Sequence, residues 1–274
     1  GQPFLEAIRQ LKWDLGKNAV CIHLTYVPYL AAAGELKTKP TQHSVKELQS
    51  LGIQPDILVL RAEHELGAGL RRKIAAFCNV SPEAVVQSLD MPTIYEVPLR
   101  MQEQGLDATI LRKLDMPVGD TPGLGPWRSF LDRRHKATEI INIGLVGKYD
   151  LQDAYKSILE ALSQAGTYND RKVKCHFINS EKITPENVSQ MLEGMDGYVI
   201  CPGFGQRGIE GKIIAAQYCR EHNRPTFGIC LGMQMMVIEF ARNVLGLTDA
   251  NSAEMDAKTE HNVIDLMEDQ KNIT

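Results

Sequence analysis

The sequence predicts an α/β protein with two doubly wound parallel sheets, one in each half of the chain. Short runs of apolar and β-branched residues alternate with segments of helical periodicity along both halves. Parallel strands joined by helical crossovers produce this alternation. A stretch rich in proline and glycine separates the halves, which predicts a linker between two domains.

Composition restricts the classes of partner. The chain has 274 residues, and its 30 basic and 34 acidic side chains give a net charge of −4. The two signs are mixed along the chain, so nothing favours nucleic acid or an anionic membrane surface as a partner. No apolar run approaches the roughly 18 residues of a membrane span, and no secretory leader is recognisable.

The cysteines indicate a reducing compartment. Six are scattered along the chain: Cys21, Cys78, Cys175, Cys201, Cys219 and Cys230. None forms a C-x-x-C pair, and four lie inside apolar strand- or helix-like runs. Reduced thiols are therefore expected rather than a disulfide framework or a zinc site, and the expected location is the cytoplasm.

The first half begins with an amphipathic helix over Gln2–Leu15. Its predicted strands are residues 18–29, 56–61 and 84–88. The helix between the first two strands is predicted to begin after an N-cap at Ser44.

A polar loop is predicted between the first strand and its helix, over residues 34–43. It contains Lys37, Thr38, Lys39, Thr41 and Gln42. Ligands of open α/β sheets bind beyond the carboxyl ends of the strands, where this loop falls. These side chains suit phosphate oxygens and a polar base, although an ordinary solvated basic loop remains the alternative.

The proline- and glycine-rich stretch covers residues 115–127, with three prolines and three glycines in thirteen residues. Beyond it, strands are predicted over residues 139–146, 172–177 and 197–201. Helices are predicted over residues 153–162, 185–192 with Thr184 as N-cap, and 211–221.

A glycine-flanked cysteine follows the last apolar run of the chain, in the order Gly228-Ile-Cys-Leu-Gly232. A Gly-x-nucleophile-x-Gly turn between strand and helix exposes its nucleophile, here Cys230. The N-terminus of the following helix favours the thiolate form. The alternative is a buried cysteine whose neighbouring glycines serve only the turn.

A second glycine-rich loop follows the preceding strand, over Pro202–Gly208. Backbone N–H groups of such a loop can turn toward a ligand, as an oxyanion hole requires, although an ordinary βα turn has the same composition. Because the two loops follow consecutive strands of one sheet, they are expected to converge.

Together these segments resemble the CTP synthase family. The second half resembles a flavodoxin-like class I glutamine amidotransferase domain through Gly228–Gln234, Pro202–Gly205 and Asp249–Glu254. The first half resembles the C-terminal part of the family's P-loop-type synthetase domain, through Lys37–Gln42 and the region from Leu60 to Lys73. The expected division is 1–117 for the synthetase part, 118–138 for the linker and 139–274 for the amidotransferase part.

The resemblance implies ATP-dependent amination of UTP to CTP, a ligase reaction of pyrimidine biosynthesis, using ammonia released from glutamine. Cys230 would form a glutamyl thioester, backbone N–H groups near Gly203 and of Leu231 would hold the oxyanion, and Gln234 and Glu254 would contact glutamine. UTP would contact Lys37, Thr38, Lys39, Gln42 and Lys73, and ATP would lie near Arg61. Arg207, Gly208 and Glu210 match the segment associated with GTP, the family's allosteric activator. A cytoplasmic homotetramer is the implied assembly.

The departures from the family pattern lead to a further expectation. No G-x-x-x-x-G-K-[ST] motif occurs, and the family's phosphate-binding loop and acidic Mg²⁺ ligands would precede Gly1. The His-x-Glu motif of the family's triad would follow Thr274, and His261 does not match it. We therefore expect an internal fragment lacking both ends, without a metal site of its own. Lacking the base for Cys230, it should make no CTP alone and hydrolyse glutamine poorly.

One more departure concerns the oxyanion loop. It reads Pro-Gly-Phe-Gly, whereas many relatives have a second glycine before the phenylalanine, so the N–H donor stays open. Two other functions also stay open. One is a different class I amidotransferase or an amidase on the same fold; the other is a non-catalytic structural or assembly fragment.

Overall fold

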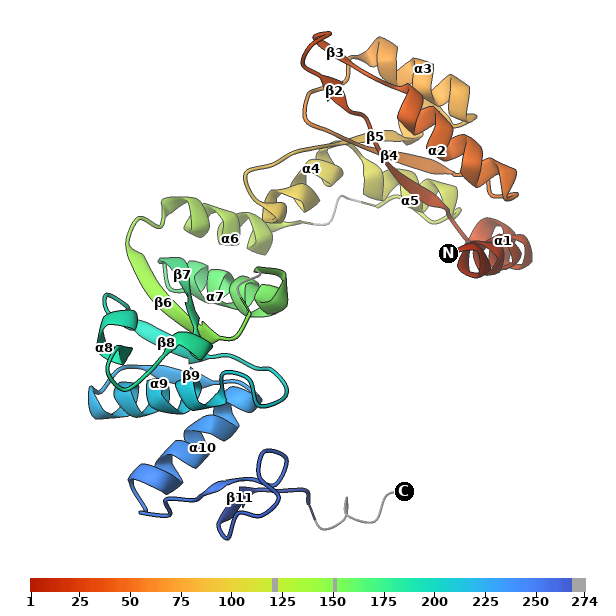
Figure 1. Ribbon diagram of the computed structural model, residues 1–274. Helices are drawn as coiled ribbons and strands as arrows, with labels where there is room; N and C mark the ends of the chain where they lie inside the picture. Colours follow the sequence, from red (N-terminus) through yellow and green to blue (C-terminus); the bar gives the residue numbers. More distant parts are fainter. Residues whose placement is uncertain (120–122, 150–151, 268–274) are drawn as a thin grey trace. The chain divides into compact units, whose positions relative to one another are not determined.

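The computed structural model describes residues 1–119, 123–149 and 152–267. The chain forms two compact units, Gly1–Leu131 and Asp132–Thr274 (Figure 1). Each unit contains a parallel sheet with helical crossovers, which confirms the predicted α/β class with parallel sheets.

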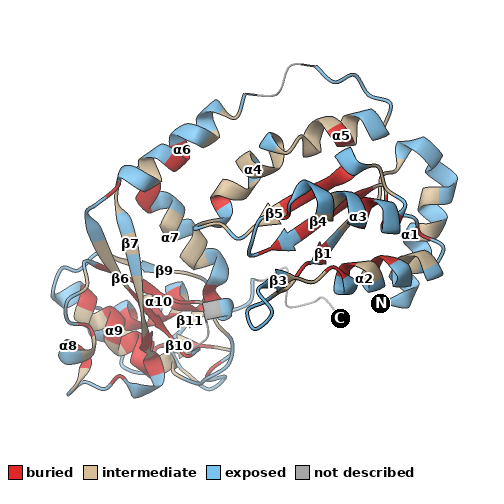
Figure 2. Ribbon diagram, turned by 90° about the horizontal axis from the view of Figure 1, so that it is seen from above, coloured by how far each residue is buried: buried red, intermediate tan, exposed pale blue. Residues whose placement is uncertain are grey.

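The sheet of the first unit has the order β1-β4-β5, with all neighbours parallel. Its strands are β1 (Ile22–Tyr26), β4 (Ile57–Ala62) and β5 (Val85–Leu89). β4 lies in the middle, and Figure 2 shows it mostly buried; Arg61 is its one exposed residue. A strand buried on both faces needs an almost unbroken apolar run, which Ile57–Leu60 supplies.

Helices complete this unit. α2 (Lys39–Ser50) and α3 (Ala68–Cys78) pack against each other, while α4 (Val97–Glu103) packs against β5. The remaining elements are α1 (Gln2–Leu15), the antiparallel hairpin of β2 (Tyr29–Leu30) with β3 (Glu35–Leu36), α5 (Leu106–Lys113), α6 (Gly125–Lys136), which continues into the second unit, and the 3₁₀ turns 16–18, 82–84 and 94–96.

The predicted start of α2 is wrong. The helix begins at Lys39 with Thr38 as N-cap, so Lys39 and Gln42 lie on its first turn rather than in a loop. Pro40 suits a first turn because its missing N–H has no intrahelical partner there. The buried Thr41 hydroxyl donates to the Tyr26 carbonyl (3.0 Å), which fixes this turn against the end of β1.

Two neighbouring predictions also need correction. Ser44 is an interior residue of α2, where its hydroxyl lies 2.8 Å from His23 Nε2. The strand predicted over 18–29 is limited to Ile22–Tyr26. Pro28 cannot donate to a strand ladder, and the chain then turns into the β2–β3 hairpin.

The sheet of the second unit has the order β7-β6-β8-β9, again fully parallel. Its strands are β6 (Ile140–Gly147), β7 (Lys172–Asn179), β8 (Gly197–Ile200) and β9 (Thr226–Gly228). In chain order this is 2-1-3-4, so the strand order reverses beside β6. Ligands of doubly wound folds bind at this switch point, beyond the carboxyl ends of the strands.

The helices of this unit are α7 (Lys156–Tyr168), α8 (Val188–Met191), α9 (Ile209–Glu221) and α10 (Leu231–Asn243), with 3₁₀ turns at 152–155 and 180–182 and a short pair of strands, β10 (Asn251–Ser252) and β11 (Asn262–Ile264).

α8 is shorter than predicted, and its N-cap is Asn187 rather than Thr184. The Asn187 side chain accepts from the Thr184 N–H and donates to the Lys182 carbonyl (both 2.8 Å). These bonds make a turn where helix was expected.

An ion pair between a half-exposed arginine and a buried carboxylate joins α9 to α10. Arg220 donates to both carboxylate oxygens of Glu239 at 2.7–3.1 Å, and Glu239 is only 2% exposed. Arg220→Met should destabilise the unit by about 2 kcal/mol, because it leaves a buried carboxylate without its cation. Urea unfolding measures this loss. Arg220→Met combined with Glu239→Leu should recover most of it, and a single variant as stable as the parent would contradict the expectation.

None of the helices in the described ranges combines the length and apolar content that crossing a bilayer requires.

Candidate active site

Cys230 occupies a strained turn between β9 and α10. It is the N-cap of α10, with φ 52° and ψ −115°, and it is exposed. A cysteine rarely adopts positive φ, because its Cβ then crowds the backbone, and such strain is concentrated at functional sites. The thiol stands at the start of a 13-residue helix, where the dipole and free N–H groups favour negative charge.

Both glycines of this turn are required by close packing. A Cβ on Gly232 would lie 1.9 Å from the Ile200 carbonyl oxygen, and one on Gly228 would lie 2.7 Å from the Met233 backbone nitrogen. The Ile229 N–H also donates to the Ile200 oxygen (3.0 Å). The turn is therefore pressed against the end of β8 and the first turn of α10.

The glycine-rich loop after β8 lies beside this turn. A Cβ built on Gly203 would be 3.7 Å from Leu231 Cδ2, the first residue of α10. The same point lies 3.5 Å from Lys148 Cε and 3.7 Å from Lys212 Nζ. The structure thus brings Gly203, Leu231 and two lysines together at the carboxyl edge of the sheet.

The two lysines were not singled out from the sequence. Lys148 follows β6, is 8% exposed and donates to the Phe204 carbonyl oxygen. Lys212 on α9 is fully buried and donates to the Cys201 carbonyl oxygen (2.7 Å). Burial lowers the pKa of Lys212 to about 8, and the charge of Lys148 acts in the same direction.

Signals for both lysines were present in the sequence. Lys148 directly follows a predicted strand, at the edge where site residues gather. Lys212 shares one helical stripe with Ala216 and Cys219, which marks it as facing the core.

A pocket of about 420 Å³ lies next to the first turn of α10. Gln234 and Glu254 both line it, together with Ser252, Ala253, Ile264, Asp265 and Leu266. The Gln234 N–H donates to the Cys230 carbonyl oxygen (3.1 Å), which places this wall one helical turn from the thiol. Gln206 donates to the Met255 carbonyl oxygen (3.0 Å), which connects the glycine-rich loop to the segment bearing Glu254.

Asp249 organises the segment that carries Glu254. It lies 2.5 Å from His261 Nδ1 and accepts from the N–H of Glu260 (3.0 Å). The hydrogen bond from His261, followed by backbone hydrogen bonds, lowers the pKa of Asp249 to about 2 from its usual 3.8.

This shift predicts how the segment responds to acid. Because folding lowers the pKa of Asp249, its contribution to the stability of the folded state is fully present above about pH 4 and is lost as pH falls through about 2. Carboxyl ¹³C shifts should show Asp249 titrating near 2. Asp249→Asn should speed hydrogen exchange at Glu260 and His261 at neutral pH, whereas Glu260→Gln should not. A midpoint near 3.8 would refute the assignment.

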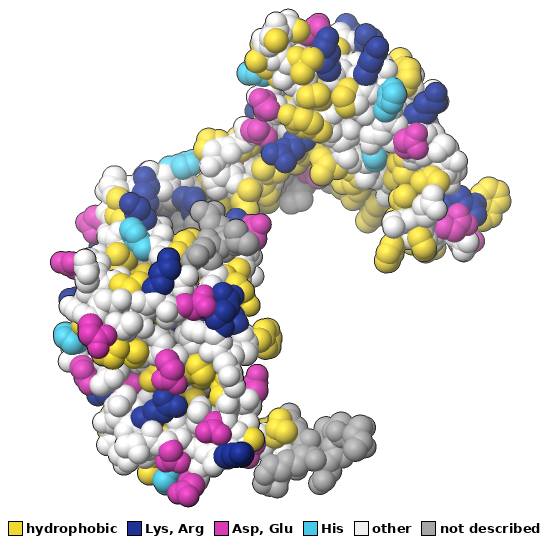
Figure 3. All heavy atoms as spheres, in the orientation of Figure 1, with side chains coloured by type: hydrophobic (Ala, Val, Ile, Leu, Met, Phe, Trp, Pro, Cys, Tyr) yellow, Lys and Arg dark blue, Asp and Glu magenta, His cyan; other side chains and the backbone are white. Residues whose placement is uncertain are grey.

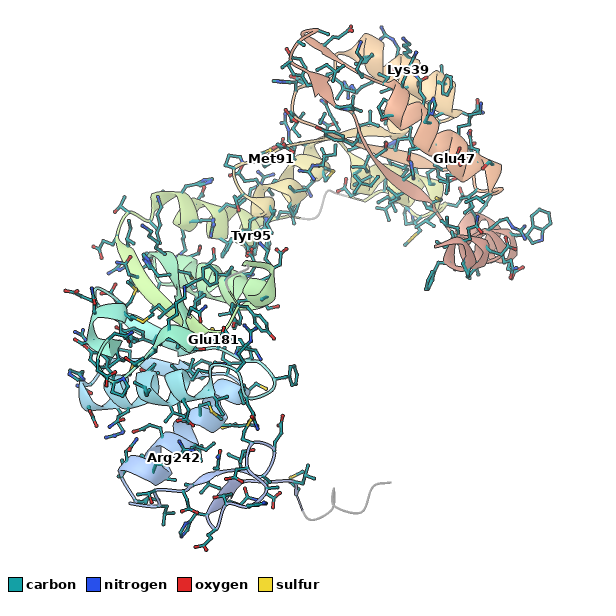
Figure 4. The ribbon with its side chains drawn as sticks, in the orientation of Figure 1. Lys39, Glu47, Met91, Tyr95, Glu181 and Arg242 are labelled. Carbon is teal, nitrogen blue, oxygen red and sulfur yellow. The ribbon has the colours of Figure 1, made fainter. Side chains whose placement is uncertain are left out.

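The Arg207–Glu210 segment faces two different neighbours. Arg207 pairs with Glu181 (2.8 Å), and its guanidinium lies 5.8 Å from the centre of the Tyr149 ring. Glu210 pairs with Arg242 of α10 (3.2 Å). Figure 4 shows Glu181 and Arg242 well apart in the unit. Between these ends, Gly208 has φ 75°, and a Cβ there would meet Ser180 Oγ at 2.4 Å, so glycine is required.

Four of the nucleotide residues predicted for the first unit lie close together in the chain. Lys37, Thr38, Lys39 and Gln42 gather at the start of α2, where Gln42 Nε2 donates to Thr38 Oγ1 (3.1 Å). Lys37 pairs with Glu35. Figure 4 labels Lys39 on α2, and Figure 3 shows Lys and Arg side chains gathered over the end of the unit that carries α2 and α3.

The other two predicted residues come from other elements of this unit. Lys73 is an exposed residue of α3. Arg61, near the carboxyl end of β4, pairs with Asp90 (3.4 Å). Within the described residues, no hydrogen bond or ion pair joins either of them to the start of α2.

The described ranges contain no group of three or more His, Cys, Asp or Glu side chains that could hold a metal ion.

Two family profiles match the chain. "CTP synthase N-terminus" matches residues 1–116, and "Glutamine amidotransferase class-I" matches residues 150–273. A trypanosomal structure described as the glutaminase domain of Trypanosoma brucei CTPS with bound acivicin is 37% identical, with a TM-score of 0.46, over 48% of this chain and 52% of that one.

Curated relatives match over nearly the whole chain. The CTP synthase of Bacteroides thetaiotaomicron is 74% identical over 274 residues, or 99% of this chain and 51% of the relative. Those of Porphyromonas gingivalis W83 and Flavobacterium johnsoniae are 61% and 60% identical, with the same coverage. The chain spans about half the length of these relatives. Since it combines both family profiles and resembles CTP synthases from end to end, the chain belongs to the CTP synthase family.

Proposed function

We propose that this chain contributes to CTP synthesis, the ATP-dependent amination of UTP with ammonia from glutamine. The observation that carries the proposal is the strained Cys230 at the start of α10, beside Gly203 and one turn from the pocket lined by Gln234 and Glu254. Family membership connects this constellation to a ligase, whereas the turn alone would indicate only an amidotransferase.

In the proposed glutaminase step, the Cys230 thiolate attacks the side-chain carboxamide carbon of glutamine. A C–S bond forms, and the negative charge that develops on the carboxamide oxygen is held by backbone N–H groups near Gly203 and of Leu231. The C–N bond then breaks, and the nitrogen leaves as ammonia after taking up a proton. Water hydrolyses the resulting glutamyl thioester to glutamate and restores the thiol.

In the proposed synthetase step, the γ-phosphoryl group of ATP is transferred to O4 of UTP, and ammonia replaces it at C4 with release of phosphate. Lys37, Thr38, Lys39, Gln42 and Lys73 are proposed to contact UTP, and Arg61 to contact ATP. Lysine ammonium groups and a helix N-terminus suit phosphate oxygens, and the first turn of α2 offers both.

The remaining parts of the proposal concern regulation and assembly. Arg207, Gly208 and Glu210 are proposed to respond to GTP, and the Mg²⁺ that accompanies ATP takes its ligands from outside the described residues. We propose a homotetramer in the cytoplasm; the six unpaired cysteines agree with a reducing compartment.

Acivicin, an electrophilic glutamine analogue, tests the glutaminase part. We expect it to label Cys230 ahead of the other five cysteines, with glutamine slowing the reaction, as followed by mass spectrometry of tryptic peptides. Labelling of Cys230 no faster than that of the partly buried Cys21 and Cys175, or none at Cys230, would favour a non-catalytic fragment.

UTP binding tests the synthetase part. UTP should shift the amide resonances of Thr38, Lys39 and Gln42, and ATP alone should not. Labelling at Cys230 without any response to UTP would favour another class I amidotransferase or an amidase.

A further inference from the structure

A fully buried lysine lies directly behind the proposed oxyanion loop. Lys212 Nζ donates to the Cys201 carbonyl oxygen at 2.7 Å and lies 3.5 Å from that of Pro202. An ammonium group out of contact with water is costly unless carbonyl oxygens or anions surround it. The acceptors here belong to the backbone of the loop rather than to a carboxylate, so the interaction acts on the conformation of the loop.

The geometry of the peptide bonds determines what this contact does. The 202–203 peptide is trans, so the Pro202 oxygen and the Gly203 N–H point in opposite directions. With the Pro202 oxygen turned toward Lys212, the Gly203 N–H is turned away from it. Pro202 itself has no N–H. The donor that Lys212 can orient in this stretch is therefore the N–H of Gly203.

Lys148 holds the other side of the same loop through the Phe204 carbonyl oxygen. Gly203 thus lies between carbonyl groups that accept hydrogen bonds from two lysines, one directly after β6 and one on α9. The 202–203 peptide cannot flip without taking the Pro202 oxygen away from Lys212, and hydrogen bonds from charged lysines to the Cys201 and Phe204 carbonyl oxygens restrain the peptides on either side.

We propose that Lys212 is a positioning residue, which holds the 202–203 peptide so that the Gly203 N–H serves as the oxyanion donor of the glutaminase site. The proposal rests on the function proposed for Cys230. It assigns the donor that the sequence left open, and it gives Lys212 a role other than stabilising the fold.

The protonation state of Lys212 offers a direct test. The groups that act on it are Cys201 at the end of β8, Lys148 after β6 and Cys230 before α10. Its pKa of about 8 lies below the usual 10.5, so the unfolded chain binds more protons between those values. The contribution of Lys212 to the free energy of unfolding therefore rises with pH between those values. Over the same range Lys212 loses its charge, and with it the proposed hold on the 202–203 peptide.

Lys212→Met separates the effect of this lysine on stability from its effect on the Gly203 N–H donor. Removing a buried charge should leave the urea midpoint unchanged or raise it. Losing the oriented donor should slow acivicin labelling of Cys230 at least about 10-fold, with iodoacetamide labelling nearly unchanged, because simple alkylation of a thiol builds up no oxyanion. Lys212→Arg keeps a cation and should restore part of the rate. Lys174→Met, at an exposed lysine of β7, is the matched control and should change neither rate.

A second measurement does not depend on Cys230. In the full chain labelled with ¹⁵N, the Gly203 amide should shift with a midpoint near pH 8, and Lys212→Met should abolish that midpoint while Lys174→Met keeps it. A Gly203 amide that ignores both pH and Lys212→Met would overturn the inference even if Cys230 reacts. Failure of acivicin to label Cys230 in a chain whose Gly203 amide behaves as expected would instead refute the proposed glutaminase.

Discussion

Gly232→Ala is expected to destabilise the second unit by about 3 kcal/mol and to abolish acivicin labelling of Cys230. The added Cβ would lie 1.9 Å from the Ile200 carbonyl oxygen, a distance that side chains do not tolerate. The backbone of β8 and the start of α10 must therefore separate, and overpacking of this kind costs about 1–3 kcal/mol or more. Urea unfolding and peptide mass spectrometry measure the two effects.

Gly69→Ala provides a matched control, because Gly69 is likewise the second residue of its helix, α3. Nothing lies within 4 Å of a Cβ at that position. Since alanine favours helices more than glycine does, Gly69→Ala should be neutral or stabilising by up to about 1 kcal/mol. Equal losses in the two variants would mean that the contact with Ile200 does not constrain the turn.

Cys230→Ser is expected to reduce acivicin labelling at residue 230 by at least about 1,000-fold, because a serine hydroxyl is far less nucleophilic than a thiolate without a strong base. Folding should be retained, since the substitution changes one atom of an exposed side chain. Cys21→Ser should leave the labelling of Cys230 unchanged. Substantial labelling of residue 230 in the serine variant would show that the probe reports exposure alone.

Cys230→Gly extends this test to the backbone. Glycine adopts positive φ without the crowding that a Cβ causes, and the strain relieved is about 1–3 kcal/mol against an entropic cost below about 1 kcal/mol. The variant should therefore unfold at higher urea concentration than the parent while losing all reactivity. A lower midpoint would mean that the turn holds cysteine without strain.

The fold class could be predicted because its signals are local. The apolar run Ile57–Leu60 predicts a buried strand, and the glycines around Cys230 predict a tight turn. Neither prediction needs residues from elsewhere in the chain. The adjacency of Gly203 and Leu231 followed from a general property of parallel sheets, in which the carboxyl ends of strands share an edge.

The predictions that failed, and the site lysines that were overlooked, depend on tertiary contacts. Ser44 is a good N-cap by type, but the hydrogen bond of Thr41 to the end of β1 starts α2 earlier. Asn187 replaces a helix by a turn because its side chain finds two backbone partners. The helical stripe places Lys212 toward the core, but its partners, the carbonyl groups of Cys201 and Pro202, come from another part of the chain. The roles proposed for all the site residues, Glu254, Lys73 and Arg61 among them, stay predictions.

The position of Lys148 has a consequence for regulation. Its stem lies 3.5 Å from the point that a Cβ on Gly208 would occupy, and its ammonium group holds the Phe204 carbonyl oxygen. One side chain therefore touches both the segment assigned to GTP and the loop assigned to the oxyanion. Under the proposed function, this one side chain can therefore couple the activator segment to the oxyanion loop. If the activator raises the affinity for glutamine, thermodynamic reciprocity requires that bound glutamine raise the affinity for the activator by the same factor.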